Sequence, residues 1–391
     1  MRYITVSEAA ARWGISERLV QRYCTQGRIP GAAKFSGRWA IPADAAKPDD
    51  PRRAASPLRE SGPILQPMPL MNTAFAPGTA LKTACAVEDP DLREIALAEY
   101  CYFTGQAEKA TVLATPLLEH TEPAVRLSAC LIVGYASLTL GQIHHARDAL
   151  ARMQQVPLET LSPALQAAAV FILNTAAVLL HLPTPVDAGD LSQALRHLPP
   201  GLRQFALYIQ AHRAYLEGEH ARSLGIVETA FAIEPDTYPI PAIYLHLIAV
   251  MDAMSLKRPE LAERHLLAAW DLARPDDLIE AFGEHHGLLG GMLEAVIKPQ
   301  WPDDFKRIID ITYRFSAGWR RVHNPDTGHA VADNLSTTEF AICMLAARSW
   351  TNQEIAAHLG LSIHTVKQYI SNALSKLGVK QRKDLKQFML L

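Results

Sequence analysis

The last sixty residues contain three closely spaced helix-start signals, and this pattern constrains the fold more than any other feature. Segments 336–339 and 351–354 each place Ser or Thr three residues before Glu, the pattern of a capping box at a helix N-terminus. Gly360 then indicates a tight turn, and Ser362 is a suitable cap for a third helix over about 363–377. The sequence therefore predicts a compact group of short helices at this end of the chain.

The third of these helices has two chemically different sides. A stripe of Val, Ile and Leu runs along one side from Val366 to Leu377 and predicts the buried face. The other side has no acid and offers donors suited to base edges and phosphates, as expected of a helix in the major groove of DNA. Most polar helix faces are simply solvated, but the two helix starts before this one favour DNA binding. The polar side chains are His364, Lys367, Gln368, Ser371 and Ser375.

This region resembles the LuxR/GerE-type helix-turn-helix over about 55 residues. The resemblance implies a four-helix domain whose third helix reads the major groove and whose fourth helix, about 381–391, often forms a dimer face. Departures at Thr338, Ser349 and Tyr369 affect the expected sequence preference and leave the fold unchanged. The matching residues are Leu335–Glu339, Thr351–Ala356, Leu361–Lys367, Asn372, Lys376–Val379 and Arg382.

The resemblance also implies which side chains contact DNA. Lys367, Gln368 and Ser371 match groove-reading positions, and Lys376 and Arg382 lie where phosphate contacts are expected. The full set of expected DNA contacts is Thr351, Asn352, His364, Thr365, Lys367, Gln368, Ser371, Ser375, Lys376 and Arg382. The expected dimer contacts are Leu385, Phe388 and Met389, which could equally pack on their own domain.

The first fifty residues contain a second group of helix and turn signals. Thr5–Glu8 has the capping-box spacing, Ser16 is the expected cap of a helix that ends before Gly27, and residues 34–42 alternate like a small hairpin. This segment resembles the excisionase- and MerR-like winged helix-turn-helix. The alternative is a docking domain that no longer binds DNA. The resemblance implies DNA contacts by Ser16, Arg18, Gln21, Arg22 and Arg38, the last with a phosphate.

Charge is distributed unevenly, although the whole chain carries only −2. Residues 1–53 hold ten basic and five acidic side chains, and residues 334–391 hold seven and three. The residues between them are left with a net charge of −11. Two basic ends around an acidic middle suit two nucleic-acid contacts that flank a domain repelled by phosphates.

The middle of the chain reads as consecutive amphipathic helices. A glycine followed five residues later by a small residue recurs at Gly105, Gly141 and Gly218, and Lys257 begins a weaker copy. The pattern is similar to a degenerate tetratricopeptide-like array of helical hairpins, whose concave surface would bind a ligand or a protein. Tyrosines of this array could line a pocket or simply pack between helices. Adjacent His285 and His286 point apart on a helix, which disfavours a metal site.

Several classes of protein are disfavoured by what the sequence lacks. It has no phosphate-binding loop and no hydrolase or metalloprotease motif, so we expect no enzyme and no cofactor. The five cysteines form no CxxC pair, which disfavours a zinc site. No signal peptide is visible, and polar residues interrupt the longest uncharged stretch, 160–186, so we expect a cytoplasmic, nucleoid-associated protein without a membrane span.

Together these features predict a mainly α chain in four parts. We expect an N-terminal winged helix-turn-helix (1–47), a flexible Pro/Ala-rich linker (48–89), an α-solenoid of helical hairpins (90–325) and a C-terminal four-helix LuxR-type domain (330–391). The leading hypothesis is a transcription regulator that binds double-stranded DNA, as a homodimer at least on DNA. A small-molecule or protein effector would act on the solenoid, with RNA polymerase as a further partner. The alternatives are a scaffold with helix-turn-helix docking modules and a recombination accessory factor.

Overall fold

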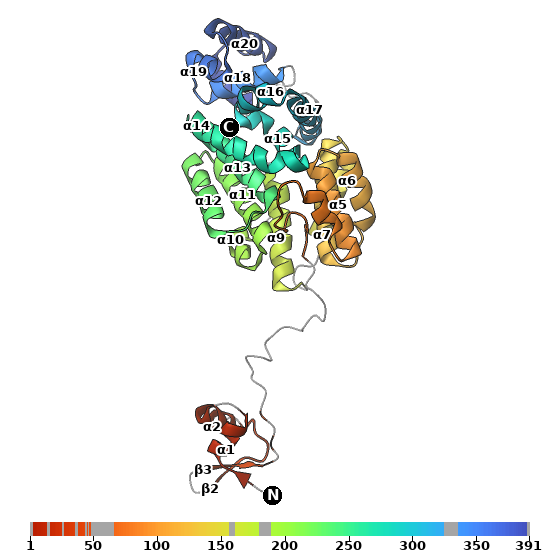
Figure 1. Ribbon diagram of the computed structural model, residues 1–391, viewed down its shortest axis with the longest axis vertical. Coiled ribbons are helices and arrows are strands. Elements are labelled where there is room, and N and C mark those ends of the chain that lie inside the picture. The colour runs from red at the N-terminus through yellow and green to blue at the C-terminus, as the bar shows by residue number, and fades with distance from the viewer. Residues whose placement is uncertain are drawn as a thin grey trace. The chain divides into compact units, whose positions relative to one another are not determined.

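The chain folds into two compact units, Met1–Ile64 and Leu65–Leu391, which are described separately (Figure 1). The computed structural model describes residues 3–13, 16–25, 27–35, 38–43, 45, 47, 66–155, 161–179, 189–323 and 335–388. Within these ranges helices predominate, which confirms the mainly α prediction. The turn at 14–15, the wing tip at 36–37 and the hinge predicted at 324–328 lie outside the described residues.

Unit 1 is a small winged helix-turn-helix. Its sheet has the order β1-β3-β2, and β2 and β3 pair antiparallel, with Lys34 opposite Trp39. The predicted capping box is present, because Thr5 N–H donates to Glu8 Oε2 at 2.7 Å and Glu8 N–H donates to Thr5 Oγ1 at 3.2 Å. The elements are β1 (Tyr3–Ile4), α1 (Val6–Trp13), α2 (Glu17–Thr25), β2 (Ala33–Phe35) and β3 (Arg38–Pro42). The core consists of Ala9, Ala10, Val20, Tyr23, Cys24, Ile29 and Ile41.

Unit 2 contains two parts. Residues 66–323 form the helical domain, and residues 335–388 form the reader. The first helices of the helical domain are α4 (Ala80–Cys85), α5 (Pro90–Phe103), α6 (Ala107–Ala114), α7 (Pro123–Thr139), α8 (Ile143–Gln154), α9 (Pro163–Leu179) and α10 (Leu191–Ala194). Its later helices are α11 (Pro200–Leu216), α12 (His220–Ile233), α13 (Pro239–Ser255), α14 (Pro259–Ala273), α15 (Glu280–His285), α16 (Lys298–Gln300) and α17 (Pro302–His323). Shorter 3-10 turns are η1 (Thr115–Leu117), η4 (Leu195–His197), η5 (Arg274–Asp276) and η6 (His286–Leu289), and η7 (Leu293–Ile297) is a π-helix.

The predicted hairpin signature marks four turns, α5–α6, α7–α8, α11–α12 and α13–α14. Gly105, Gly141 and Gly218 take left-handed backbone with φ of 76°, 70° and 78°, and Lys257 takes the same conformation with φ of 56°. In each turn the next N–H donates to the carbonyl five residues earlier, as from Arg258 to Ala253 at 2.8 Å. The small residues five positions after each turn residue are buried where the paired helices cross: Ala110, Ala146, Ser223 and Ala262. The weak fourth copy is therefore a true member of the array.

The predicted linker is wrong over its second half. Residues 66–89 pack on the rest of the helical domain, and the buried Glu99 carboxyl group accepts the N–H groups of Leu70 and Met71 at 2.8 and 3.0 Å. Asp276 similarly accepts from Gly78 at 2.6 Å. These partners lie up to 198 residues away in sequence, so a Pro-rich composition could not reveal them.

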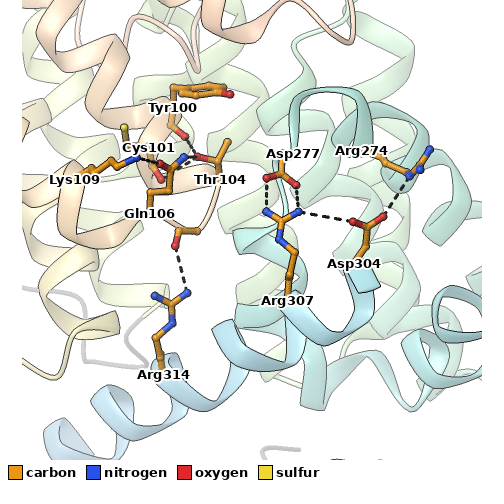
Figure 2. A network of polar contacts seen from close by, with 11 residues as sticks. Tyr100, Cys101, Thr104, Gln106, Lys109, Arg274, Asp277, Asp304, Arg307 and Arg314 are labelled. Carbon is orange, nitrogen blue, oxygen red and sulfur yellow. Dashed lines mark hydrogen bonds and ion pairs between the residues drawn. The ribbon is translucent and has the colours of Figure 1, made fainter. Parts of the chain in front are cut away.

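Helix α17 closes the helical domain by contacting both its first and its last hairpin regions (Figure 2). Arg314 donates to the Gly105 carbonyl at 3.3 Å, at the α5–α6 turn. About two turns earlier on the same helix, Arg307 donates to Asp277 at 2.7 Å, in the segment after α14. Helix α17 is continuous over Pro302–His323. Helix α17 also packs against α7 and α15.

Candidate nucleic-acid interface

The reader has the three helices and both capping boxes that its sequence predicts. Its elements are α18 (Thr337–Ala347), α19 (Asn352–Leu359), α20 (Ile363–Lys376) and the 3-10 helix η9 (Arg382–Phe388). The side chains of Ser336 and Thr351 accept from the N–H groups of Glu339 and Glu354, whose carboxylates bond back to the cap N–H groups. The expected fourth helix, 381–391, is present over Arg382–Phe388 as the 3-10 helix η9, and residues 389–391 lie outside the described residues.

Helix α20 separates its two sides as expected. Val366, Ile370 and Ala373 are buried, which fixes the helix against α18 and α19. The opposite side is solvent-exposed, and the sequence has no acid between Glu354 and Asp384. The exposed predicted contacts are His364, Lys367, Gln368, Ser371 and Ser375. Nothing obstructs these side chains among the described residues, so the face is available for a groove.

Some predicted contacts have partners inside the protein. Lys376 Nζ lies 2.7 Å from Glu339 Oε2, and Arg382 donates to the Trp350 carbonyl and to Asn352 Oδ1. Burial lowers the pKa of Arg382. Burial opposes ionisation of Glu339, yet hydrogen bonds from Lys376 and Ser336 hold its pKa below the ordinary value. These side chains therefore brace the reader, and phosphate contact by Lys376 or Arg382 stays a prediction.

Two other predicted contacts lie at helix starts. The Thr365 hydroxyl bonds to Ser362 Oγ at 2.8 Å, and its N–H donates to the same oxygen at 3.0 Å. Thr351 is exposed and serves as the cap of α19. Both residues thus shape the ends of helices beside the exposed face, and the structure does not test their contact with DNA.

Two of the expected dimer residues, Leu385 and Phe388, lie on η9. Leu385 is fully buried and packs in the core, while Phe388 is half-buried against the same core. Met389 lies outside the described residues. Leu385 thus packs within its own reader, and dimer formation through η9 stays a prediction.

Sequence reasoning missed a built contact between the reader and the helical domain. Arg348, only 8% exposed at the end of α18, donates to the Tyr215 hydroxyl at 2.8 Å and to the Leu288 carbonyl at 2.6 Å. Trp350 Nε1 donates to the Met254 carbonyl at 3.2 Å. Ser349 between them takes left-handed backbone with φ of 63°, a conformation that glycine adopts at less cost than serine.

Three glycines of segment 286–291 make room for the reader, and we name this segment the seat. A Cβ on Gly287 would lie 2.5 Å from Phe340 Cε1 of α18. A Cβ on Gly290 or Gly291 would lie 2.7 or 2.8 Å from reader side chains, and both glycines also have positive φ. Three glycines in six residues of an otherwise helical region were the available signal for this close approach.

Helix α2 of unit 1 presents the predicted N-terminal contacts. Arg18, Gln21 and Arg22 are exposed, and Ser16 is exposed just before the helix. Val20 and Tyr23 face the small core behind them. The Arg38 side chain lies outside the described residues.

The described residues contain no group of three His, Cys, Asp or Glu side chains that could hold a metal ion. His285 and His286 instead bond to separate partners. Tyr208 lies 2.9 Å from His285 Nε2, and Glu294 lies 2.8 Å from His286 Nε2.

The helices of the reader and of unit 1 each define a helix-turn-helix domain, and the chain is a DNA-binding helix-turn-helix regulator. Residues 333–389 match the family model of bacterial regulatory proteins of the luxR family, and residues 3–45 match that of a helix-turn-helix domain. These matches confirm the predicted LuxR-type domain at one end and a helix-turn-helix domain at the other. No curated protein and no solved structure matches the chain. In the described part of the chain, no helix has the length and apolarity needed to cross a membrane.

Proposed function

We propose that this chain is a sequence-specific transcription regulator whose helix α20 reads the major groove of double-stranded DNA. The observation that carries the proposal is the exposed, acid-free side of α20, with Lys367, Gln368 and Ser371 on one surface. Lys pairs well with guanine and Gln with adenine at the base edges in the major groove. The capped, well-packed helix behind these side chains holds them in a fixed arrangement.

Control of this activity would come from the helical domain. A small molecule or protein bound there would act through the seat, since the seat and α13 carry the reader. We propose a homodimer on DNA, with RNA polymerase as a further partner and the cytoplasm, at the nucleoid, as the location. Unit 1 would add a second DNA contact through Arg18, Gln21 and Arg22.

The test is selection of random duplex DNA by the full-length protein at physiological salt. We expect an enriched motif with two half-sites about one helical turn apart, because a dimer places two recognition helices at that spacing. Gln368→Ala should relax base preference at one position and cost about 1–3 kcal/mol, whereas Lys376→Gln should weaken all sequences alike. If both variants lost DNA affinity equally and independently of sequence, the assigned reading face of α20 would be wrong. If the selection enriched no sequence under any condition, the proposed function would be abandoned.

A further inference from the structure

Helix α20, which carries most of the predicted DNA contacts, has one exposed apolar side chain. This side chain lies at the N-terminal end of the helix. Ile363 is the first residue of α20 and is 44% exposed. All other exposed side chains of this helix are polar. The other large hydrophobic side chains exposed among the described residues are outside the reader: Tyr3, Leu81, Val112, Ile233 and Tyr313.

Single exposed apolar residues are common on protein surfaces, so exposure alone says little. Position distinguishes Ile363, because the N-terminal residues of a recognition helix are the ones that contact base edges. The start of α20 is also held firmly. Ser362 Oγ accepts the Thr365 N–H at 3.0 Å and bonds its hydroxyl at 2.8 Å, which holds the backbone at the start of the helix, where Ile363 lies.

We infer that Ile363 is a specificity residue that packs against the C5-methyl group of a thymine in the major groove, an inference that rests on the proposed reading role of α20. The thymine methyl is the apolar feature of the major-groove edges, and aliphatic side chains recognise it by contact. Contact with that methyl group would bury the exposed surface of Ile363 and so favour binding, which a polar side chain at this position would not do.

The helix geometry also places this thymine. Ile363 and Lys367 are one turn apart on neighbouring positions of the helix surface, so their side chains advance about 6 Å along the axis. Successive base pairs of DNA are about 3.4 Å apart. The thymine read by Ile363 therefore lies within about two base pairs of the base contacted by Lys367.

The experiment replaces thymine by deoxyuridine, one position at a time, in the duplex selected by the full-length protein. Deoxyuridine lacks only the methyl group, so base pairing and charge are unchanged. We expect one position within the predicted distance to weaken wild-type binding about fourfold, the value corresponding to one buried methyl group. Ile363→Ala should bind the thymine duplex more weakly and lose nothing further on deoxyuridine substitution. Ile363→Val, which keeps a branched methyl-bearing side chain, should retain most of the sensitivity.

Ile233→Ala is the matched control, because Ile233 is a similarly exposed isoleucine on α12 of the helical domain. It should leave both affinity and deoxyuridine sensitivity unchanged. Thermal melting of each variant checks that the fold is retained. Insensitivity of the wild-type protein at every thymine, or full sensitivity of Ile363→Ala, would overturn the inference while sequence-specific binding still supported the proposed function. Absence of any selected sequence would instead count against the proposed function.

Discussion

The two helix-turn-helix domains of this chain follow the same local rules but depend on different amounts of surrounding structure. Unit 1 packs two helices and a small sheet around seven buried residues of its own. The reader shares one continuous core with the helical domain, and Arg348 and Trp350 are both buried at the contact between them. A capping box and a polar helix face define the helix-turn-helix motif in both domains. The stability of each domain comes from the buried core against which its helices pack.

This difference also separates the expected roles in DNA binding. The reader is mounted through the back of α18 and the end of α19, where Phe340 and Leu359 meet the glycines of the seat. That contact leaves the exposed side of α20 free. Unit 1 is a compact unit with a small core of its own. Each prediction below tests one side of this comparison.

The largest expected effect comes from removing unit 1. If both domains contact one DNA molecule, the second contact is made at high effective concentration and raises affinity by about 10²–10⁴-fold. Deletion of residues 1–50 should therefore lower the affinity of the chain for its selected DNA by at least about 100-fold and shorten the footprint. Fluorescence anisotropy and footprinting measure both quantities.

The matched variant for this deletion is the full chain with Arg18→Gln and Arg22→Gln, which removes two exposed charges from α2 and leaves its core residues in place. It should reproduce much of the loss. Unchanged affinity and footprint after the deletion would show that unit 1 is a docking domain, and the second DNA contact would be abandoned.

The next effect concerns the buried support of the reader. Arg348→Ala removes a guanidinium that donates to Tyr215 and to the Leu288 carbonyl, and it leaves both acceptors without this charged donor. We expect the free energy of unfolding of unit 2 to fall by about 3 kcal/mol. Chemical denaturation followed by circular dichroism measures the change.

A matched control is Arg222→Ala, because Arg222 is an exposed arginine of the same unit with ion pairs only to Glu217 and Glu219. Such surface pairs contribute little, so no measurable change is expected. If Arg348→Ala behaved like this control, the contact between reader and seat would not stabilise the unit. The comparison with unit 1 would then lose its basis.

The sequence predicted those parts of the fold that local chemistry determines. The capping boxes at Ser336 and Thr351, the turn at Gly360 and the buried stripe from Val366 to Leu377 all follow from spacing within a few residues. A helical hairpin at Lys257 was predicted the same way, as a weaker copy of the repeat, and Lys257 takes left-handed backbone in its turn.

Long-range packing could not be predicted in this way. Residues 66–89 were assigned to a linker because the whole segment 48–89 is rich in proline and alanine, yet Glu99 and Asp276 hold the backbone of its second half. Prediction of the DNA-contacting residues has the same limit, because contacts within the protein do not follow from local sequence. Lys376 and Arg382 were predicted as phosphate contacts from their positions alone, and the structure gives both of them protein partners.

The smallest effect that sharpens the comparison is a difference in pH dependence. Unit 2 buries Glu99 and Glu280, and burial raises the pKa of each to about 8, with the neighbouring Glu284 adding to the effect on Glu280. The acids described in unit 1, Glu8 and Glu17, are exposed. A carboxyl group whose folded pKa is raised binds a proton in the folded state that the unfolded state releases above about pH 4.3. Unit 2 should therefore lose stability as pH rises from about 5 towards 8, while unit 1 should show no such trend.

Glu280→Gln isolates one of these groups, because the amide is neutral at every pH. For a single such group the slope is at most about 1.4 kcal/mol per pH unit, and the variant should flatten the pH dependence of unit 2 by up to that amount. Glu122→Gln is a suitable control, since Glu122 lies partly exposed at the start of α7 and its side chain makes no cap hydrogen bond there. Urea unfolding at pH 5, 6, 7 and 8 measures the slopes. An unchanged slope in Glu280→Gln would mean that Glu280 is ionised in the folded protein, because only a carboxyl group that is protonated in the fold and ionised in the unfolded chain produces this sign.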